Sequence, residues 1–129
     1  MGGRFLLDTN IVIALFAQDP LVQERVRQAE AVFVPSIVLG ELYYGARRSA
    51  NIQANLSRID ELAATASVLP CDVEAAQQYG LIKNSLRARG RPIPENDIWV
   101  AAIARQHALI LASRDMHFKE VDGLQLETW

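Results

Sequence analysis

The chain has 129 residues, of which 50% are hydrophobic and 22% are charged, and its formal net charge is −2. This length corresponds to one domain, residues 1–129, and the composition excludes a disordered chain, a collagen-like repeat and a disulfide-rich scaffold. The slightly acidic charge balance excludes a general nucleic-acid-coating protein, which would be strongly basic. The single cysteine cannot form an internal disulfide, and the apolar runs fall short of the roughly 20 residues that cross a membrane, so we expect a soluble cytoplasmic protein without membrane contact.

Short apolar runs alternate with helical patterns along the chain. In order, the sequence predicts a strand at 5–7, a helix at 9–17, a short helix opened by Asp19 and Pro20, a strand at 31–34, helices at 36–48 and 52–63, a strand at 68–70, a helix at 73–87, a loop at 89–96, a helix at 97–106, and strands at 109–112 and 124–126. Thr9 or Asn10 is expected to cap the first helix, and Ser36 the third. Strands that are apolar on both faces and alternate with helices indicate a parallel sheet covered on both sides. We therefore predict the α/β class, as a three-layer α/β/α domain with a central parallel β-sheet.

Four acidic side chains lie where solvated surface acids are not expected. Asp8 and Asp115 each follow a predicted buried strand, at the end that faces the ligand crevice in parallel sheets. Glu41 lies inside the most apolar helix, where a carboxylate needs a buried partner. Asp97 opens a helix after a loop that contains proline. The structural alternatives are helix capping for Asp8, capping or a first-turn position behind an Asn96 cap for Asp97, and a turn for Asp115.

Convergence of these four acids would favour a bound cation. Two carboxylates ~5 Å apart repel each other by about 3 kcal/mol at an effective dielectric near 20. An all-oxygen ligand set selects Mg²⁺ or Mn²⁺ over zinc. The two histidines, His107 and His117, are expected to stand apart from each other and from the acids, as surface or helix-end residues. The sequence also contains neither a glycine-rich phosphate loop nor a motif for a nucleophilic Ser or Cys.

Four motifs follow one another along nearly the whole chain. They are Leu-Leu-Asp-Thr-Asn at 6–10, Ser-Ile-Val-Leu-Gly-Glu-Leu at 36–42 with Gly45, Asn-Asp-Ile-Trp-Val-Ala-Ala at 96–102, and Ser-Arg-Asp-Met-His-Phe at 113–118. Together they resemble the PIN domain family, and specifically the VapC-type toxins of bacterial toxin–antitoxin pairs. The resemblance implies a metal-dependent endoribonuclease whose acidic quartet is Asp8, Glu41, Asp97 and Asp115. Where the family commonly has Thr, two residues before the last acid, this chain has Ser113, which keeps the hydroxyl.

Phosphodiester hydrolysis with one or two metal ions gives each acid an expected role. Asp8 and Asp97 are expected to bind the first metal directly, and Asp115 to be a ligand or the partner of a second metal. Glu41 is expected to bind through water or to orient the attacking water. The hydrogen-bond donors expected to orient these acids are Thr9, Asn10 and Ser113.

The partners implied by the sequence are RNA, an antitoxin and a second copy of the chain. Arginine suits phosphate recognition, so RNA is expected to bind two arginine clusters, although a G+C-rich genome would also enrich arginine. The resemblance implies a homodimer and silencing by a small VapB-type antitoxin, which is expected to place an arginine among the acids. Part of a set of large apolar side chains is expected to form an interface, the alternative being that all are core. The arginines are Arg47, Arg48, Arg87, Arg89 and Arg91, and the apolar residues are Ile37, Leu42, Tyr43, Tyr44 and Trp99.

Other functional classes fit the residues less well. A phosphoacceptor receiver domain has this size and an Asp after a strand, but it needs an acidic pair near the first strand and a late lysine, and Lys119 is poorly placed. A haloacid-dehalogenase-like phosphatase needs a second Asp where this chain has Asn10. A PIN-fold nuclease that acts on DNA or in rRNA processing stays open. The resemblance to the VapC-type toxins implies a toxin that cleaves tRNA or another structured RNA.

Overall fold

The computed structural model describes residues 2–129. Its elements in chain order are β1 (Arg4–Leu7), α1 (Thr9–Phe16), α2 (Pro20–Gln28), β2 (Ala31–Pro35), α3 (Ser36–Arg47), α4 (Ile52–Thr65), β3 (Ser67–Leu69), α5 (Val73–Ala88), α6 (Glu95–Gln106), β4 (Ile110–Ala112), the 3₁₀-helix η1 (Met116–Glu120) and β5 (Leu126–Glu127). Strands and helices thus alternate as the apolar pattern predicts. Within residues 2–129, no helix is both long enough and apolar enough to cross a membrane.

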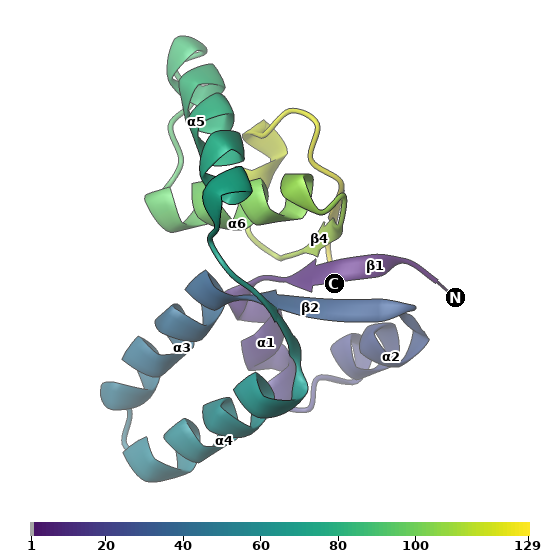
Figure 1. The fold of residues 1–129 in the computed structure, drawn as a ribbon. Helices are drawn as coiled ribbons and strands as arrows, with labels where there is room; N and C mark the ends of the chain where they lie inside the picture. Colours follow the sequence, from purple (N-terminus) through teal and green to yellow (C-terminus); the bar gives the residue numbers. More distant parts are fainter. Residues whose placement is uncertain (1) are drawn as a thin grey trace.

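The five strands form one parallel sheet in the order β3-β2-β1-β4-β5. Leu6 of β1 pairs with Phe33 of β2 on one side and with Leu111 of β4 on the other. Leu6 and Leu7 are both buried, as expected for a central strand whose two faces are both covered. Helices α1 to α4 lie on one side of the sheet and α5 and α6 on the other (Figure 1), so the predicted three-layer α/β/α fold is confirmed.

The order of the strands creates a switch point between β1 and β4. The chain adds β2 and β3 on one side of β1, crosses to the other face through α5 and α6, and then adds β4 on the other side of β1. Ligands of open parallel sheets bind beyond the carboxyl ends of the strands at such a point. Leu7 pairs with Ala112 at these ends, and the Asp8 N–H donates to the Ala112 carbonyl at 3.0 Å. The residues that follow β1 and β4 are therefore neighbours.

The beginnings of two helices differ from the sequence predictions. Asp8, rather than Thr9 or Asn10, occupies the N-cap position of α1, and its carboxylate makes no capping hydrogen bond but accepts one from Ser113. Pro35 occupies the N-cap position of α3, so Ser36 is the first helical residue and not its cap. Proline fits this position because its backbone is already extended, with φ −76° and ψ 146°.

Two other boundaries show how side chains decide where a helix begins. Asp19 caps α2 as its position before Pro20 predicts, accepting from the N–H groups of Leu21 at 3.0 Å and Val22 at 3.2 Å. Helix α6 begins at Glu95, after Pro94 at the N-cap, so Asp97 lies in the first turn and neither it nor Asn96 is the cap. The expected helix start at Asp97 is therefore two residues too late.

The large apolar residues expected to include an interface are divided between core and surface. Leu42 belongs to the core, and Ile37, Tyr43 and Trp99 are partly buried and pack against it. Tyr44 is 65% exposed, with the Arg48 guanidinium 5.7 Å from its ring centre. Of these five side chains, Tyr44 is the one that presents a large apolar surface to solvent.

Candidate active site

Asp8 is a buried carboxylate at the end of β1. Its side chain is 5% exposed, and it accepts a hydrogen bond from Ser113 Oγ at 2.7 Å and a longer one from Asn10 Nδ2 at 3.4 Å. Burial raises the pKa of Asp8, and the negative charges of Glu41 and Asp115 raise it further, while the Ser113 hydroxyl opposes the rise. Asp8 is thus held in place by donors but repelled by other acids.

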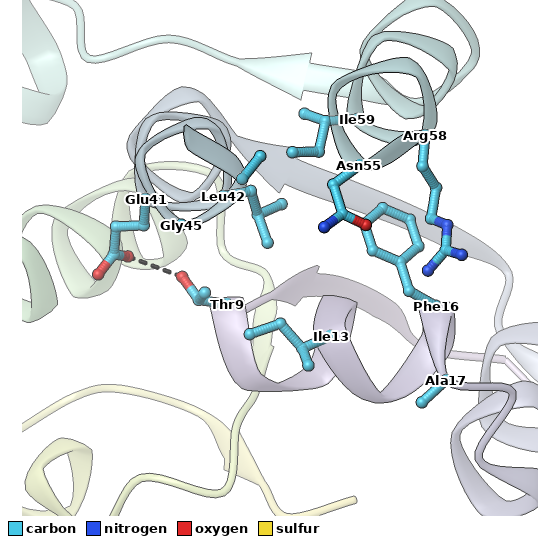
Figure 2. A pocket seen from close by; sticks show the side chains of 11 residues that line it. Thr9, Ile13, Phe16, Ala17, Glu41, Leu42, Gly45, Asn55, Arg58 and Ile59 are labelled. Carbon is cyan, nitrogen blue, oxygen red and sulfur yellow. Dashed lines mark hydrogen bonds between the residues drawn. The ribbon is translucent and has the colours of Figure 1, made fainter. Parts of the chain in front are cut away.

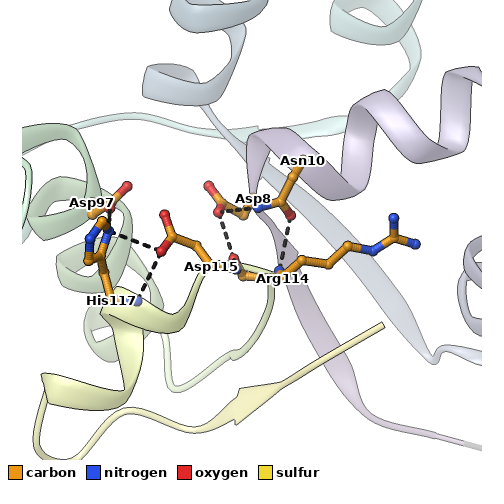
Figure 3. Close-up of polar contacts among 7 residues, drawn as sticks. Asp8, Asn10, Asp97, Arg114, Asp115 and His117 are labelled. Atoms are coloured by element: carbon orange, nitrogen blue, oxygen red, sulfur yellow. Dashed lines mark hydrogen bonds and ion pairs between the residues drawn. The ribbon is translucent and has the colours of Figure 1, made fainter.

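Asp97, Asp115 and His117 form a compact group beside Asp8 (Figure 3). His117 Nδ1 lies 3.0 Å from Asp115 Oδ1 and 3.3 Å from Asp97 Oδ2. One possible ligand atom from each of the three residues lies within 4.8 Å of the other two. Residues from the start of α6 and from the loop after β4 are therefore brought together at one point.

The expectation that His117 stands apart from the acids is wrong. Asp115 is the N-cap residue of η1, and its Oδ1 accepts the backbone N–H of His117 at 2.9 Å. This turn brings the imidazole, two residues later in the chain, back over Asp97 and Asp115. His107 does lie at a helix end, as the C-cap residue of α6. Neither histidine belongs to a metal-ligand spacing motif in the sequence. Only the conformation of the loop that carries His117 shows which of the two lies beside the acids.

The pKa of Asp97 is raised by burial and by the neighbouring acids. Burial, together with the charges of Asp115 and Asp8, raises it from 3.8 to about 6, and the contact with His117 opposes this rise. The Asp97 side chain is only 14% exposed, so solvent screens these charges weakly. The convergence expected from the sequence thus has a direct electrostatic consequence for Asp97.

Glu41 reaches the region of Asp8 from α3. Thr9 Oγ1 donates to Glu41 Oε1 at 2.7 Å (Figure 2), which provides the partner that a carboxylate in an apolar helix requires. The charge of Glu41 raises the pKa of Asp8, so the two groups interact. The structure therefore brings all four predicted acids to the switch point, where Asp8 interacts with Glu41, Asp97 and Asp115.

Ser113 and Asn10 connect the loops that carry these acids. Ser113, 1% exposed, donates to Asp8 Oδ2 and accepts the Asp115 N–H at 3.0 Å. Asn10 Oδ1 accepts the Arg114 N–H at 3.1 Å. The hydroxyl and the amide thus fix the ends of β1 and β4 relative to each other, as their expected role requires.

Arg114 is a further residue at the site that sequence patterns did not single out. Its Nη2 lies 3.0 Å from Asp19 Oδ2, at the cap of α2, and its Nε donates to the Trp129 carbonyl at 2.9 Å. The hydrogen bond from the Arg114 guanidinium lowers the pKa of Asp19. Arg114 therefore anchors the loop before Asp115 to two segments that are distant in sequence, which no local spacing indicates.

A groove of about 400 Å³ runs between α1, α3 and α4 (Figure 2). Thr9 and Glu41 lie at one end, and Phe16 and Arg58 lie at the other. Its wall is mainly apolar and includes Ile13, Leu42, Gly45, Ala46 and Ile59. The groove therefore leads from an apolar surface directly to an acid of the site.

The predicted RNA-binding arginines are all exposed and lie outside the acidic group. Arg47 and Arg48 lie at the end of α3, whereas Arg87, Arg89 and Arg91 lie at and after the end of α5. These ends of α3 and α5 point away from each other, on opposite sides of the switch point (Figure 1). In the second cluster, Arg89 donates to the Glu120 carbonyl and Arg91 lies 3.9 Å from the Glu120 carboxylate.

Comparison with known proteins identifies the family to which this fold belongs. Residues 5–124 match the family model of the PIN domain. A Haemophilus influenzae protein named Ribonuclease VapC2 is 38% identical over 129 residues, covering 98% of both chains. A Shigella flexneri protein named tRNA(fMet)-specific endonuclease VapC is 35% identical over 129 residues, with the same coverage. The structure of DNA-bound VapBC from Salmonella typhimurium matches 98% of both chains with a TM-score of 0.90 at 28% identity.

The parallel sheet and the acids at its switch point define a nuclease of the PIN type. The chain belongs to the PIN domain family and, within it, to the VapC ribonucleases, the toxins of VapBC toxin–antitoxin systems. The structural neighbours from Rickettsia felis, Salmonella typhimurium and Haemophilus influenzae are VapBC complexes. The resemblance found in the four sequence motifs is confirmed.

Proposed function

We propose that this VapC protein is an endoribonuclease that depends on Mg²⁺ or Mn²⁺ and that its cognate antitoxin inhibits. The observation that carries the proposal is the convergence of Asp8, Asp97 and Asp115, whose mutual repulsion adds to the burial that raises the pKa of Asp97 to about 6. A bound divalent cation offsets this repulsion, and carboxylate oxygens are the ligands such ions prefer. The names of its relatives favour RNA, and tRNA in particular, as the substrate.

The residues present fit a metal-dependent hydrolysis. Asp8, Asp97 and Asp115 would hold the ion, which when bound supplies a nucleophilic water and positive charge for the phosphate. Glu41, fixed by the Thr9 hydroxyl, accepts a proton from the attacking water or orients it. Ser113 and Asn10 keep Asp8 in position by donating hydrogen bonds to its carboxylate, as the polar groups around metal ligands generally do.

Incubation with three labelled substrates tests this function. Structured RNA, single-stranded DNA and acetyl phosphate are each mixed with the protein and Mg²⁺, Mn²⁺ or EDTA. We expect cleavage of RNA alone, with either ion and not with EDTA. Equal cleavage of DNA would favour the broader PIN nuclease, and transfer from acetyl phosphate would favour a receiver domain. Sequencing of RNA 5′ ends after induced expression then identifies the RNA that is cut.

The two arginine clusters are expected to bind RNA phosphates on opposite sides of the acids. Each phosphate contact adds about 0.7–0.9 to the slope of log affinity against log salt. Replacing Arg47 and Arg48 with Gln should therefore lower this slope and weaken RNA binding, while Mn²⁺ affinity stays unchanged. Replacing Arg87, Arg89 and Arg91 should have a similar effect, reduced where Glu120 already holds two of them. Unchanged RNA affinity after all five replacements would show that the arginines have no role in RNA binding.

The antitoxin is proposed to occupy the groove between α1, α3 and α4. An apolar segment of the antitoxin fits the groove wall, and Glu41 at one end offers a carboxylate to an arginine of the inhibitor. A segment bound in this way reaches the acidic group and blocks the approach of RNA and metal. Inhibition thus follows from the direct connection between groove and site.

Homodimerisation completes the proposed assembly. Tyr44 is the exposed member of the apolar set, and the Arg48 guanidinium over its ring adds a polar rim of the kind found around interfaces. Tyr44 also borders the hollow that contains Glu41 and Asn96. A dimer formed there would bring the second copy close to the site.

A further inference from the structure

We propose that His117 is itself a metal ligand, through Nδ1, and that it makes this site prefer Mn²⁺ over Mg²⁺. The proposal rests on the metal-dependent function proposed above and goes beyond its acidic quartet. It follows from the position of one imidazole nitrogen between two carboxylates that come from different segments, the N-cap of η1 and the first turn of α6.

The distances around Nδ1 suit a shared ion. Two ligands at right angles around an ion with bonds of about 2.1 Å lie about 3.0 Å apart. Nδ1 lies 3.0 Å from Asp115 Oδ1 and 3.3 Å from Asp97 Oδ2. In the structure Nδ1 lies within hydrogen-bond distance of both carboxylates. Neutral imidazole is a common metal ligand through either ring nitrogen, so the same three atoms could hold a cation between them.

The backbone holds the imidazole in this place. The His117 N–H donates to Asp115 Oδ1 at 2.9 Å, so the turn that begins η1 fixes the direction of the side chain (Figure 3). Phe118, the next residue, is buried and anchors the turn in the core. The His117 side chain is nevertheless 53% exposed, so an ion can reach Nδ1 from solvent.

An imidazole ligand changes the metal preference of a carboxylate site. Mg²⁺ favours oxygen ligands and retains its waters, whereas later divalent ions accept nitrogen more readily. Binding through Nδ1 therefore strengthens the binding of Mn²⁺ more than that of Mg²⁺. The all-oxygen site predicted from the sequence becomes a mixed site with one nitrogen.

Pulsed electron paramagnetic resonance of bound Mn²⁺ tests for the nitrogen directly. The protein is labelled with ¹⁵N-histidine and loaded with one equivalent of Mn²⁺, and the hyperfine coupling to ¹⁵N is recorded. We expect a directly coordinated nitrogen in the wild type and its loss in His117→Asn. The chain has two histidines, so His107→Gln is the matched control that should keep the signal.

Titration calorimetry separates a ligand from a residue that only positions the acids. Asn can donate a hydrogen bond to the carboxylates but is a poor substitute for an imidazole ligand. We expect His117→Asn and His117→Ala each to lower Mn²⁺ affinity about tenfold and Mg²⁺ affinity less than about threefold. Wild-type Mn²⁺ affinity in His117→Asn, or bound Mn²⁺ without ¹⁵N coupling, would overturn the proposal. Failure of the wild type to bind Mn²⁺ at all would instead overturn the metal-dependent function, and this proposal with it.

Discussion

Replacing Asp97 with Asn is expected to abolish RNA cleavage and, in the absence of metal, to stabilise the fold. The substitution removes a proposed metal ligand whose ion contributes several kcal/mol to the transition state, so the rate should fall at least about a thousandfold. Mn²⁺ affinity should fall with it. Asn has nearly the same shape as Asp but carries no charge, so the repulsion from Asp8 and Asp115 disappears.

The raised pKa of Asp97 makes the stability of the fold depend on pH. The pKa of Asp97 is 3.8 in its ordinary state and about 6 in the fold, so the folded protein holds a proton that the unfolded chain has released. Stability is therefore lost as the pH rises from about 4 to about 6, by at most about 3 kcal/mol. Above pH 6, Asp97→Asn should melt at least about 3 °C higher than the wild type in EDTA. Below pH 4 the two proteins should melt together.

Thermal melts in EDTA across this pH range and a cleavage assay in Mn²⁺ make the measurement. Asp122→Asn is the matched control, because Asp122 is exposed and contributes its backbone carbonyl, not its carboxylate, to the bond from Arg105. The control should cleave and melt as the wild type does. Full activity in Asp97→Asn, or in the equivalent Asp8→Asn, would falsify the assignment of the acids to one site.

Filling the antitoxin groove with the variant Gly45→Trp is expected to free the toxin from inhibition without impairing cleavage. Apart from its chain neighbours and the backbone of its own helix, a Cβ built on Gly45 meets no heavy atom of residues 2–129 within 4 Å, although the residue lines the groove. The indole should therefore enter the groove and not the core. Trp is also a better helix former than Gly, so α3 should keep its stability. Antitoxin binding should weaken at least about a hundredfold, which corresponds to about 2.8 kcal/mol.

Co-expression with the cognate antitoxin, followed by calorimetry and an RNA cleavage assay, measures this effect. The wild type should form a stable complex with suppressed activity, whereas Gly45→Trp should cleave RNA in the presence of the same antitoxin. Gly80→Trp on α5 is the control, since a Cβ there also meets no described heavy atom within 4 Å and lies outside the groove. Equal inhibition of both variants would place the antitoxin elsewhere.

The sequence was sufficient for the strands and for the four acids. A short apolar run that is buried on both faces has one structural solution in a chain of this kind, and the acid after it must lie at the carboxyl edge of the sheet. Asp8 and Asp115 were found by this reasoning. Glu41 was found because a carboxylate in an apolar helix requires a partner, which proved to be Thr9.

The contacts that complete the site depend on loop conformation, which spacing does not determine. His117 reaches Asp97 only because the Asp115 carboxylate closes a turn. No hydrophobic periodicity in the sequence predicts this turn. The predictions of the helix caps were wrong for a related reason. Asp8 holds the cap position of α1 but directs its carboxylate to Ser113, a residue far along the chain.

The contacts of Arg114 predict where mutations that weaken the toxin should be found. Its side chain joins the loop before Asp115 to the cap of α2, and Asp19 uses one carboxylate oxygen for that cap and the other for Arg114. Loss of Asp19 would therefore loosen both α2 and the loop before Asp115, although Asp19 is not one of the four acids of the site. In a selection for cells that survive expression of the toxin, substitutions at this surface position should be recovered beside those of the acids. Mutations that weaken the toxin would then also be found at Asp19, a residue outside the group of acids.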